Sequence, residues 1–280
     1  MNQLLVLQSD FGLSDGAVSA MYGVALSVNP DLTISNLTHD IPPFHIWEAS
    51  YRLLQTVPYW PKETVFVSVV DPGVGSKRKS IVARLVTGQF VITPDNGTLS
   101  HLLKGVRVDE VRELDETKNR LPHSGESYTF HGRDIYAYTG ARLASGVISF
   151  NEVGGRLNSD QLVRLDINEA KLFTNEAIGQ IDILDIRYGN AWTNIPRTLF
   201  TQTGATYGDQ VKVLLTRART ILYQKTIPFG RSFADVPVGQ DLLYVNSLDY
   251  LAIGTNQKSF ADANAIGTGT GWVVSVQPHH

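Results

Sequence analysis

The order of apolar segments along the chain constrains the fold more than any other feature. In the first half, short apolar stretches alternate with segments that carry apolar residues at helical spacing, the first five being 4–8, 15–28, 32–37, 46–57 and 65–70. From Ala177 onward, strand-like segments follow one another, separated by Gly, Asn and Asp, and none has helical spacing. Alternation of strand and helix predicts parallel strands joined by crossover helices, whereas uninterrupted strands predict an antiparallel sheet.

The sequence therefore predicts two domains, which suits a chain of 280 residues. We expect an α/β N-terminal domain over 1–165, Rossmann-like, with helices and a mostly parallel sheet. A linker is expected over 166–176, and an all-β barrel domain over 177–280.

Composition and charge narrow the class of function. The 24 basic and 27 acidic residues give a net charge of −3, so nothing favours a nucleic-acid or anionic-membrane partner. Without cysteine there are no disulfides or thiolate metal sites, and no spacing typical of zinc or calcium ligands occurs, so we expect no metal. The N-terminal stretch lacks the basic flank of a signal peptide, and no apolar run approaches the roughly 18 residues of a membrane span. We therefore expect a cytoplasmic protein.

An acidic residue follows the first expected strand directly, in Ser9-Asp10-Phe11-Gly12. Ligands of open α/β sheets bind at the carboxyl ends of strands, and an ionised Asp there can accept both hydroxyls of a ribose. Asp10 could instead cap the following helix, although Asp15 stands closer to the expected helix start. Both interpretations of Asp10 remain open from local sequence.

The third expected strand also ends on an acid, Asp71, in Val-Val-Asp-Pro-Gly-Val-Gly-Ser, and Lys77, Arg78 and Lys79 follow. The loop does not match the phosphate-binding G-x-x-x-x-G-K-[ST] motif, and Asp-Pro-Gly is an ordinary turn sequence. Local sequence thus favours a plain turn over an anion site.

Two further segments combine polar and aromatic residues. His131 stands next to Gly132 before a helix expected over 134–143, and a lone His is more often structural than catalytic. The segment from Asp185 to Ile195 packs Asp, Tyr, Asn and Trp closely, which suits a planar heterocycle or, equally, a well-packed β turn.

Taken together and in this order, the motifs SDFG, VVDPGVGS, PDNG, FHGRD and YGNAWTNI resemble those of the S-adenosylmethionine hydroxide adenosyltransferase family, which is related to fluorinase and chlorinase. The resemblance covers nearly the whole chain. It implies hydrolysis of S-adenosylmethionine to adenosine and methionine by water or hydroxide attack at ribose C5′, without a cofactor. It also implies a homotrimer, with each site between the N-terminal domain of one subunit and the C-terminal domain of the next.

The resemblance also implies roles for individual residues. The Asp, Arg and His that hold the attacking water fall on Asp71, Arg78 and His131. An Asp paired with Arg is a poor base, so His131 is expected to accept the proton. The substrate-binding positions of the family fall on Asp10 for the ribose, Phe44 for stacking, and Asp185, Tyr188, Asn190, Phe233 and Ser247 in the second domain.

Three departures from the halogenases point to water as the nucleophile. The halogenases carry Tyr in place of Asp71 and Ser in place of Gly132, and fluorinases have a long insertion where this chain has a tight turn at 87–89. A carboxylate repels a halide, which needs a dry pocket with neutral donors. The Arg residues that halogenases place near Leu248 and Gly254 are missing here, so the methionine carboxylate is expected to be held differently.

Three alternatives to the hydrolase remain at this level. The first is a halide-dependent adenosyl transferase that makes 5′-halo-adenosine. The second is a protein that binds S-adenosylmethionine or a nucleoside without turnover. The third, which uses no family resemblance, is a phosphate-binding α/β hydrolase that uses Lys77 and Arg78 on anions.

Overall fold

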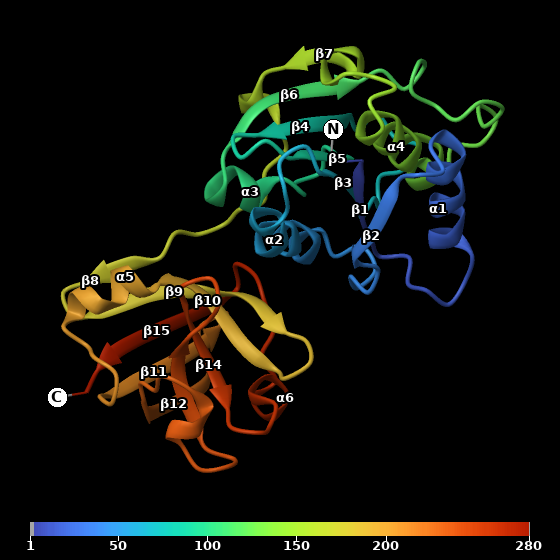
Figure 1. Cartoon of the computed structure of the whole chain (residues 1–280). Helices are drawn as coiled ribbons and strands as arrows, with labels where there is room; N and C mark the ends of the chain where they lie inside the picture. The colour runs from blue at the N-terminus through green and yellow to red at the C-terminus, as the bar shows by residue number, and fades with distance from the viewer. Residues whose placement is uncertain (1–2, 280) are drawn as a thin grey trace. The chain divides into compact units, whose positions relative to one another are not determined.

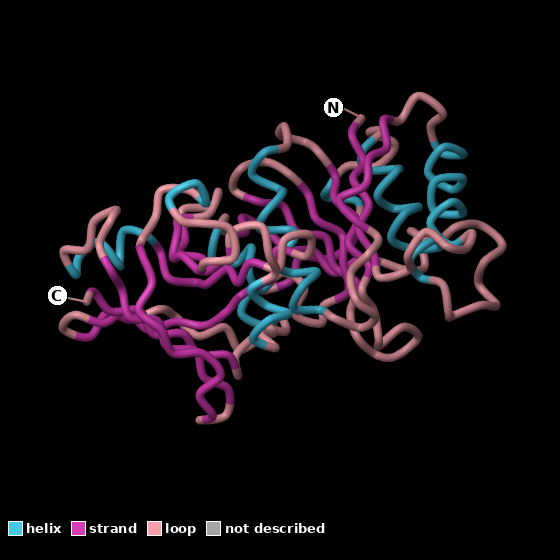
Figure 2. Tube along the Cα trace, turned by 90° about the horizontal axis from the view of Figure 1, so that it is seen from below, coloured by secondary structure: helices cyan, strands magenta, loops and turns pink. Residues whose placement is uncertain are grey.

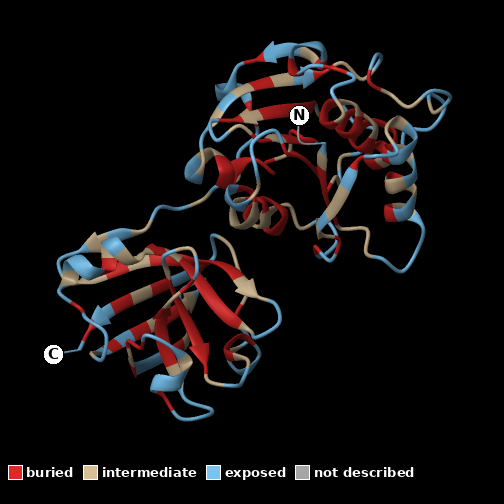
Figure 3. Ribbon diagram, in the orientation of Figure 1, coloured by how far each residue is buried: buried red, intermediate tan, exposed pale blue. Residues whose placement is uncertain are grey.

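The computed structural model describes residues 3–279 and divides the chain into two compact units at the Leu165–Asp166 boundary (Figure 1). Each unit has its own hydrophobic core, visible as buried strands in Figure 3.

The N-terminal unit begins with alternating strands and helices and continues with more strands than the sequence predicted. Its elements are β1 (Leu4–Ser9), α1 (Ala17–Val28), β2 (Thr33–Thr38), α2 (Ile46–Thr56), β3 (Val65–Val69), β4 (Ser80–Leu85), β5 (Phe90–Pro94), α3 (Ser100–Gly105), β6 (Val108–Leu114), the π-helical segment η2 (Gly132–Ala137), α4 (Tyr138–Ala144) and β7 (Gly154–Leu157), with short 3₁₀ turns between some of them. The helix expected over 134–143 thus begins earlier, as a π-helical segment directly after His131.

These strands form one sheet in the order β2-β1-β3-β5-β4-β6-β7. β1 pairs in parallel with β2 and β3, and β3 with β5, whereas β4, β6 and β7 add antiparallel pairings. The sheet is mixed, so the expectation of a mostly parallel sheet is wrong beyond β5. The physical reason is the tight turn between β4 and β5, which is long enough only for an antiparallel hairpin.

Both faces of the sheet are covered by helices, and alternate strand residues divide between them. Leu5 and Leu7 of β1 pack in one cluster with residues of α1 and α4, while Val6 packs in another with residues of α2 and α3. This division follows from the two-residue period of a strand. Figure 1 shows α1 and α4 on one side of the sheet and α2 and α3 on the other.

The order of the first strands creates the place where a ligand can bind. From β1 the chain goes to β2 on one side and then to β3 on the other. Loops that leave such a switch point diverge and leave a crevice at the carboxyl ends of the strands. Asp10 follows β1 and Asp71 follows β3, and the pairing of Ser9 with Val69 brings the two ends together.

The C-terminal unit is dominated by strands, as Figure 2 shows. Its elements are β8 (Lys171–Phe173), β9 (Glu176–Asp185), β10 (Asn190–Pro196), α5 (Arg197–Phe200), β11 (Gln210–Arg217), β12 (Thr220–Pro228), the 3₁₀ turn η6 (Phe233–Asp235), β13 (Asp241–Val245), β14 (Tyr250–Thr255), α6 (Phe260–Asn264) and β15 (Trp272–Pro278). Two short helices, α5 and α6, therefore interrupt a region for which no helix was predicted.

The antiparallel strands of this unit run in the order β12-β11-β15-β9-β10-β14-β13, with β8 on β9. The two ends of that order approach each other, because Phe229 bridges to Leu243 and Asp241 accepts hydrogen bonds from Tyr223 and Lys225. The sheet is therefore nearly closed and barrel-like.

Residues 3–279 contain neither a membrane-spanning helix nor a cluster of metal-ligating side chains. No helix in that range is both long and apolar enough to span a bilayer. The same range contains no group of three or more His, Cys, Asp or Glu side chains arranged to hold a metal ion.

Candidate functional site

A pocket of about 250 Å³ opens at the carboxyl ends of β1 and β3. Asp10, Phe44, Asp71, His131 and Gly132 all line it, so four of the residues predicted to act in the N-terminal domain meet at one place. Its remaining lining is apolar or neutral, and the only charged groups among its lining residues are the two carboxylates.

Asp10 binds the backbone of the loop that follows β2. Its Oδ2 accepts the Phe44 N–H at 2.8 Å, and Phe44 has φ = 67°, in the left-handed region. The Ala17 N–H at the start of α1 is bonded instead by Asp15 Oδ1, at 2.9 Å. The N-cap of α1 is Gly16, and Asp15 bonds the first helical N–H, so Asp10 takes no part in starting the helix and lies beside the pocket.

Asp71 and Arg78 form a buried ion pair. Arg78 Nη2 lies 2.6 Å from Asp71 Oδ2, and Nε lies 3.0 Å from Oδ1. The Asp71 side chain is 4% exposed and that of Arg78 is 10% exposed. The loop that local sequence treated as a plain turn therefore also folds its arginine back onto its own aspartate.

His131 joins this pair from a distant segment. Arg78 Nη2 donates to its Nδ1 at 2.9 Å, and since a guanidinium cannot accept, the neutral ring carries its proton on Nε2. Nε2 is buried and has no hydrogen-bond partner among residues 3–279. Burial lowers the pKa of His131 below its ordinary 6.5, helped by Arg78 and Arg120 and opposed by Glu116 and Asp71.

Arg78 also has polar neighbours that do not line the pocket and that the sequence did not predict. Arg78 Nη1 donates to Ser80 Oγ at 2.9 Å, and the Ser80 hydroxyl donates to Glu116 Oε1 at 2.6 Å. Tyr136 OH lies 2.8 Å from the same Ser80 oxygen, and burial raises the pKa of its phenol, which stays neutral and donates. None of the three belongs to a local motif, and their importance follows only from their contact with Arg78.

These contacts engage all three nitrogens of the Arg78 guanidinium. Its partners are Asp71, His131 and Ser80, with Glu116 Oε1 at 3.6 Å from Nη1. Lys79 pairs with Glu113 at the surface, and Lys77 is exposed, so neither lines the pocket. The basic cluster is therefore poorly placed to bind a phosphate.

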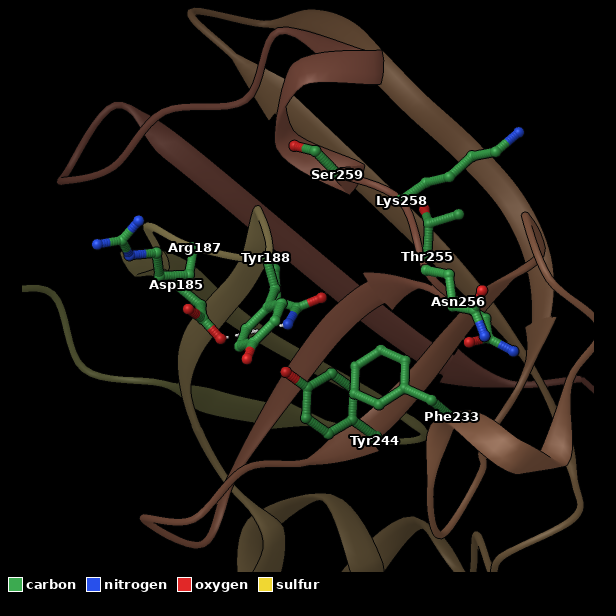
Figure 4. A pocket seen from close by; sticks show the side chains of 11 residues that line it. Asp185, Arg187, Tyr188, Phe233, Tyr244, Thr255, Asn256, Lys258 and Ser259 are labelled. Atoms are coloured by element: carbon green, nitrogen blue, oxygen red, sulfur yellow. Dashed lines mark hydrogen bonds between the residues drawn. The ribbon is translucent and has the colours of Figure 1, made fainter.

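A second pocket, of about 650 Å³, lies in the C-terminal unit (Figure 4). Asp185 at the end of β9, Tyr188 in the following loop, Asn190 at the start of β10 and Phe233 all line it, as the resemblance implied. The Phe233 ring packs 4.9 Å from that of Tyr244, which forms part of the wall. Aromatic faces thus adjoin polar groups in this pocket.

Asn190 carries an unused acceptor there. Its Nδ2 donates to Asp185 Oδ2 at 3.4 Å, but its Oδ1 is buried without a hydrogen-bond partner among the residues described. A Cβ added at Gly254 would come within 2.4 Å of this Oδ1 and 2.9 Å of the Phe233 ring. This close approach leaves no room for a side chain at position 254.

Ser247 does not line this pocket. It is exposed in the turn between β13 and β14, whereas the pocket is lined by Thr255–Ser259, at the other end of β14. Of the ten residues predicted to act in the site, the two pockets bring together eight, four in each. Arg78 contacts two of those eight from behind, and Ser247 stands apart.

Comparison with known proteins shows the family to which this chain belongs. Residues 5–154 match the model of the SAM hydroxide adenosyltransferase N-terminal domain, and residues 179–273 match that of its C-terminal domain. A protein named (R)-S-adenosyl-L-methionine hydrolase from Salinispora arenicola is 32% identical over 262 residues, 93% of each chain. Another of that name from Methanocaldococcus jannaschii is 35% identical over 198 residues, 69% of this chain and 67% of that protein.

The comparisons also include halogenases and solved structures. A fluorinase from an Actinoplanes species is 28% identical over 284 residues, covering 93% of each chain. The crystal structure of an uncharacterised conserved protein from Thermotoga maritima superposes with a TM-score of 0.89 at 30% identity, covering 98% of this chain and all of that one. The fold of the whole chain is therefore one already seen in crystals.

Proposed function

Because the chain belongs to the S-adenosylmethionine hydroxide adenosyltransferase family, we propose that it hydrolyses S-adenosylmethionine to adenosine and methionine. The observation that carries the proposal is the Asp71, Arg78 and His131 cluster beside Asp10 in one pocket. Hydrolase relatives at 32–35% identity support water as the nucleophile.

The reaction needs a positioned nucleophile more than an acid. The water oxygen forms a bond to ribose C5′ while the C5′–S bond breaks and its electron pair returns to sulfur. Methionine leaves as a neutral thioether, so no proton has to be delivered to the leaving group. The water loses one proton, and holding it in line with the C5′–S bond supplies much of the rate.

The hydrogen bonds suggest how the three residues divide this work. His131 Nδ1 is occupied by Arg78 and Nε2 is buried without a partner, so a small rotation of the ring brings Nε2–H to the water oxygen. The ion pair with Arg78 makes Asp71 a weak base, but Asp71 lines the pocket and is the acceptor left in this cluster once His131 Nδ1 is occupied, so we assign the proton to its carboxylate. This reverses the roles expected from sequence, in which His131 accepted the proton. Arg78 becomes a positioning residue that holds both.

The charges in the pocket favour a cationic substrate and an uncharged nucleophile. Asp10 and Asp71 are carboxylates and no Lys or Arg lines the pocket; Arg78 balances the charge of Asp71, so the net negative charge is that of Asp10. Such a site attracts a sulfonium and repels halide and phosphate, because like charges at a few ångströms interact unfavourably in a partly buried site. This supports hydrolysis over halogenation and over the phosphate-binding alternative.

The C-terminal pocket supplies groups that suit the rest of the substrate. Phe233 and Tyr188 offer aromatic faces for adenine, the Asn190 amide adjoins them, and the Asp185 carboxylate can bind the methionine ammonium. The N-terminal pocket is smaller than the roughly 300–1,000 Å³ typical of ligand sites. We infer that a complete site needs groups from both units. The homotrimer implied by the resemblance would supply them from neighbouring subunits, and we expect the protein to work in the cytoplasm.

Removing the Asn190 amide should weaken substrate binding. We expect Asn190→Ala to raise KM for S-adenosylmethionine about tenfold, the scale of one lost buried hydrogen bond, with a smaller change in kcat. Steady-state kinetics with product quantification measures both. Asn151→Ala, which removes an exposed amide in the other unit, should leave KM unchanged. Equal KM values for Asn190→Ala and wild type would contradict this role.

Gly132 tests the difference from the halogenases. A Cβ at this position would lie 3.0 Å from two atoms of the Phe11 ring, which also lines the pocket. We therefore expect Gly132→Ser to displace Phe11 and lower kcat/KM roughly tenfold without producing halogenation. Gly125→Ser is the matched control, since a Cβ there meets nothing within 4 Å. Formation of 5′-halo-adenosine by Gly132→Ser alone would contradict the prediction.

The proposed function is tested by products. Purified protein is incubated with S-adenosylmethionine, with and without chloride or fluoride, and the products are separated by chromatography. Adenosine and methionine in equal amounts, independent of halide, support hydrolysis. A 5′-halo-adenosine would establish the alternative that the fluorinase relatives favour. Tight binding without any product would indicate the non-catalytic alternative.

A further inference from the structure

A buried serine–histidine pair lies behind the N-terminal pocket and outside the proposed mechanism. The Ser9 hydroxyl lies 2.6 Å from Nδ1 of His39, and the two residues are 0% and 3% exposed. Neither lines the pocket. His39 Nε2 lies 2.8 Å from Asn36 Oδ1, which also accepts the Tyr22 hydroxyl at 2.8 Å. Since an amide oxygen only accepts, Nε2 carries the proton and Nδ1 accepts that of Ser9.

A nucleophilic role for this pair does not fit its position. Serine, histidine and an amide or carboxylate linked in sequence occur in nucleophilic catalysis. Here the serine has no exposed surface and no access to the pocket, so its oxygen cannot meet a substrate. The neighbouring backbone indicates a different purpose.

The pair joins two loops that carry pocket residues. These segments are 9–12, at the end of β1, and 39–44, after β2. They are also tied by the Gly12 N–H, which donates to His39 O at 2.8 Å, and by the Phe44 N–H, which donates to Asp10 Oδ2 at 2.8 Å. We call this set of contacts the loop clamp. It holds Phe44 at φ = 67°, a left-handed conformation that is unfavourable for a residue with a side chain.

We propose that His39 is a positioning residue, whose ring holds the loop clamp through Ser9 and so places Asp10 and Phe44 for the ribose of the substrate. The identity of the ligand rests on the proposed function, whereas the clamp can be tested without any ligand. His39 acts through other residues and does not touch the substrate itself.

The clamp requires a neutral ring. A proton on Nδ1 would face the Ser9 oxygen, and the Ser9 hydroxyl proton would lose its acceptor in a place without access to water. Burial lowers the pKa of His39 below 6.5, opposed by the charge of the adjacent Asp40. The other polar groups near the ring are the Asn36 amide, the Tyr22 phenol beyond it and Asp10, next to Ser9. The clamp is thus intact at neutral pH and weakens as the pH falls through the lowered pKa of His39.

Four variants separate the clamp from general stability. His39→Ala removes the acceptor, Ser9→Ala removes the donor, and the double variant tests whether they act together. His39→Asn keeps an acceptor near Nδ1 and cannot titrate. His123→Ala, in a separate exposed loop, is the control histidine. Hydrogen exchange of peptides covering 9–12 and 39–44 and steady-state kinetics are measured on the full chain.

We expect His39→Ala to accelerate exchange in both loops and to raise KM, each roughly tenfold, the scale of one buried hydrogen bond. Ser9→Ala should do the same, and the double variant no more than either single one. His39→Asn should resemble the wild type at neutral pH and lack its loss of protection at acid pH. His123→Ala should change nothing.

Unchanged exchange in both loops of His39→Ala would overturn the proposal, as would additive effects of the two alanine variants. These readouts need no turnover. A protein that shows the exchange effects but forms no adenosine would keep the clamp and refute the proposed function. Faster exchange with an unaltered KM would overturn the link from the clamp to the ribose.

Discussion

Replacing Asp71 with Asn should lower kcat for S-adenosylmethionine hydrolysis about 10²- to 10⁴-fold, the range that a positioned proton acceptor contributes. Asn keeps the size of the side chain and can still accept a hydrogen bond from Arg78, but it is a far weaker base. The effect should fall on kcat and leave the affinity for adenosine nearly unchanged. Single-turnover kinetics and calorimetric titration with adenosine measure the two quantities.

His131→Ala should have an effect of similar size, and the double variant should be little worse than either single one, because residues that act on one water are not additive. Lys77→Ala, in the same loop but exposed, is the control and should match the wild type. Unchanged turnover in both Asp71→Asn and His131→Ala would remove the proposed mechanism.

The same cluster predicts the acid side of the pH profile. Protonation of His131 would place N–H on Nδ1 against the Arg78 donor, which agrees with a pKa lowered from 6.5. Activity that needs the neutral ring is therefore fully present above pH 6.5 and lost as the pH falls through the lowered pKa. When kcat is measured over about pH 5 to 9, the protonation of His131 should cause no loss of rate near neutral pH.

Replacing Arg78 with Ala should destabilise the N-terminal unit by about 3–5 kcal/mol, because it leaves the buried Asp71 carboxylate without a positive partner. The Asp71 side chain is 4% exposed and has no other cation within ion-pair distance among residues 3–279. Ser80 and His131 lose a partner in the same substitution. Urea denaturation, with hydrogen exchange of β1 and β3 to locate the loss, measures the change.

Lys79→Ala is the matched control for that experiment. Its ion pair with Glu113 joins side chains that are 42% and 47% exposed, and such pairs contribute about 0–1 kcal/mol. A loss of less than about 1 kcal/mol in Arg78→Ala would mean that water replaces the guanidinium and that the pair is not effectively buried.

Local sequence predicted most elements that the structure contains, since strong periodicity marks β1, α1, α2 and β3. It failed where pairing partners decide the outcome. β6 (Val108–Leu114) has apolar residues only at every third position, which is not the two-residue period of a strand, so it was not recognised. Together with the β4–β5 hairpin it makes the sheet mixed. The short helices α5 and α6 have too few turns to show a helical period.

Part of the site could likewise be predicted from local sequence, and part could not. Asp10 and Asp71 could be placed from sequence because each directly follows a strand, and the carboxyl ends of neighbouring parallel strands meet at one edge. His131 was linked to them only by resemblance, since it lies 53 residues from Arg78. Ser80, Glu116 and Tyr136 carried no signal, and neither did the loop clamp.

The sequence by itself determined the two-part organisation, the strand ends that carry the carboxylates and, through the order of its motifs, the family. Only the tertiary structure decided which nitrogen of His131 is free, that Arg78 is fully engaged and that Ser9 binds His39. The physical reason is that periodicity and turn residues act over neighbouring positions, whereas tautomers and buried hydrogen bonds depend on groups that packing brings together from distant segments.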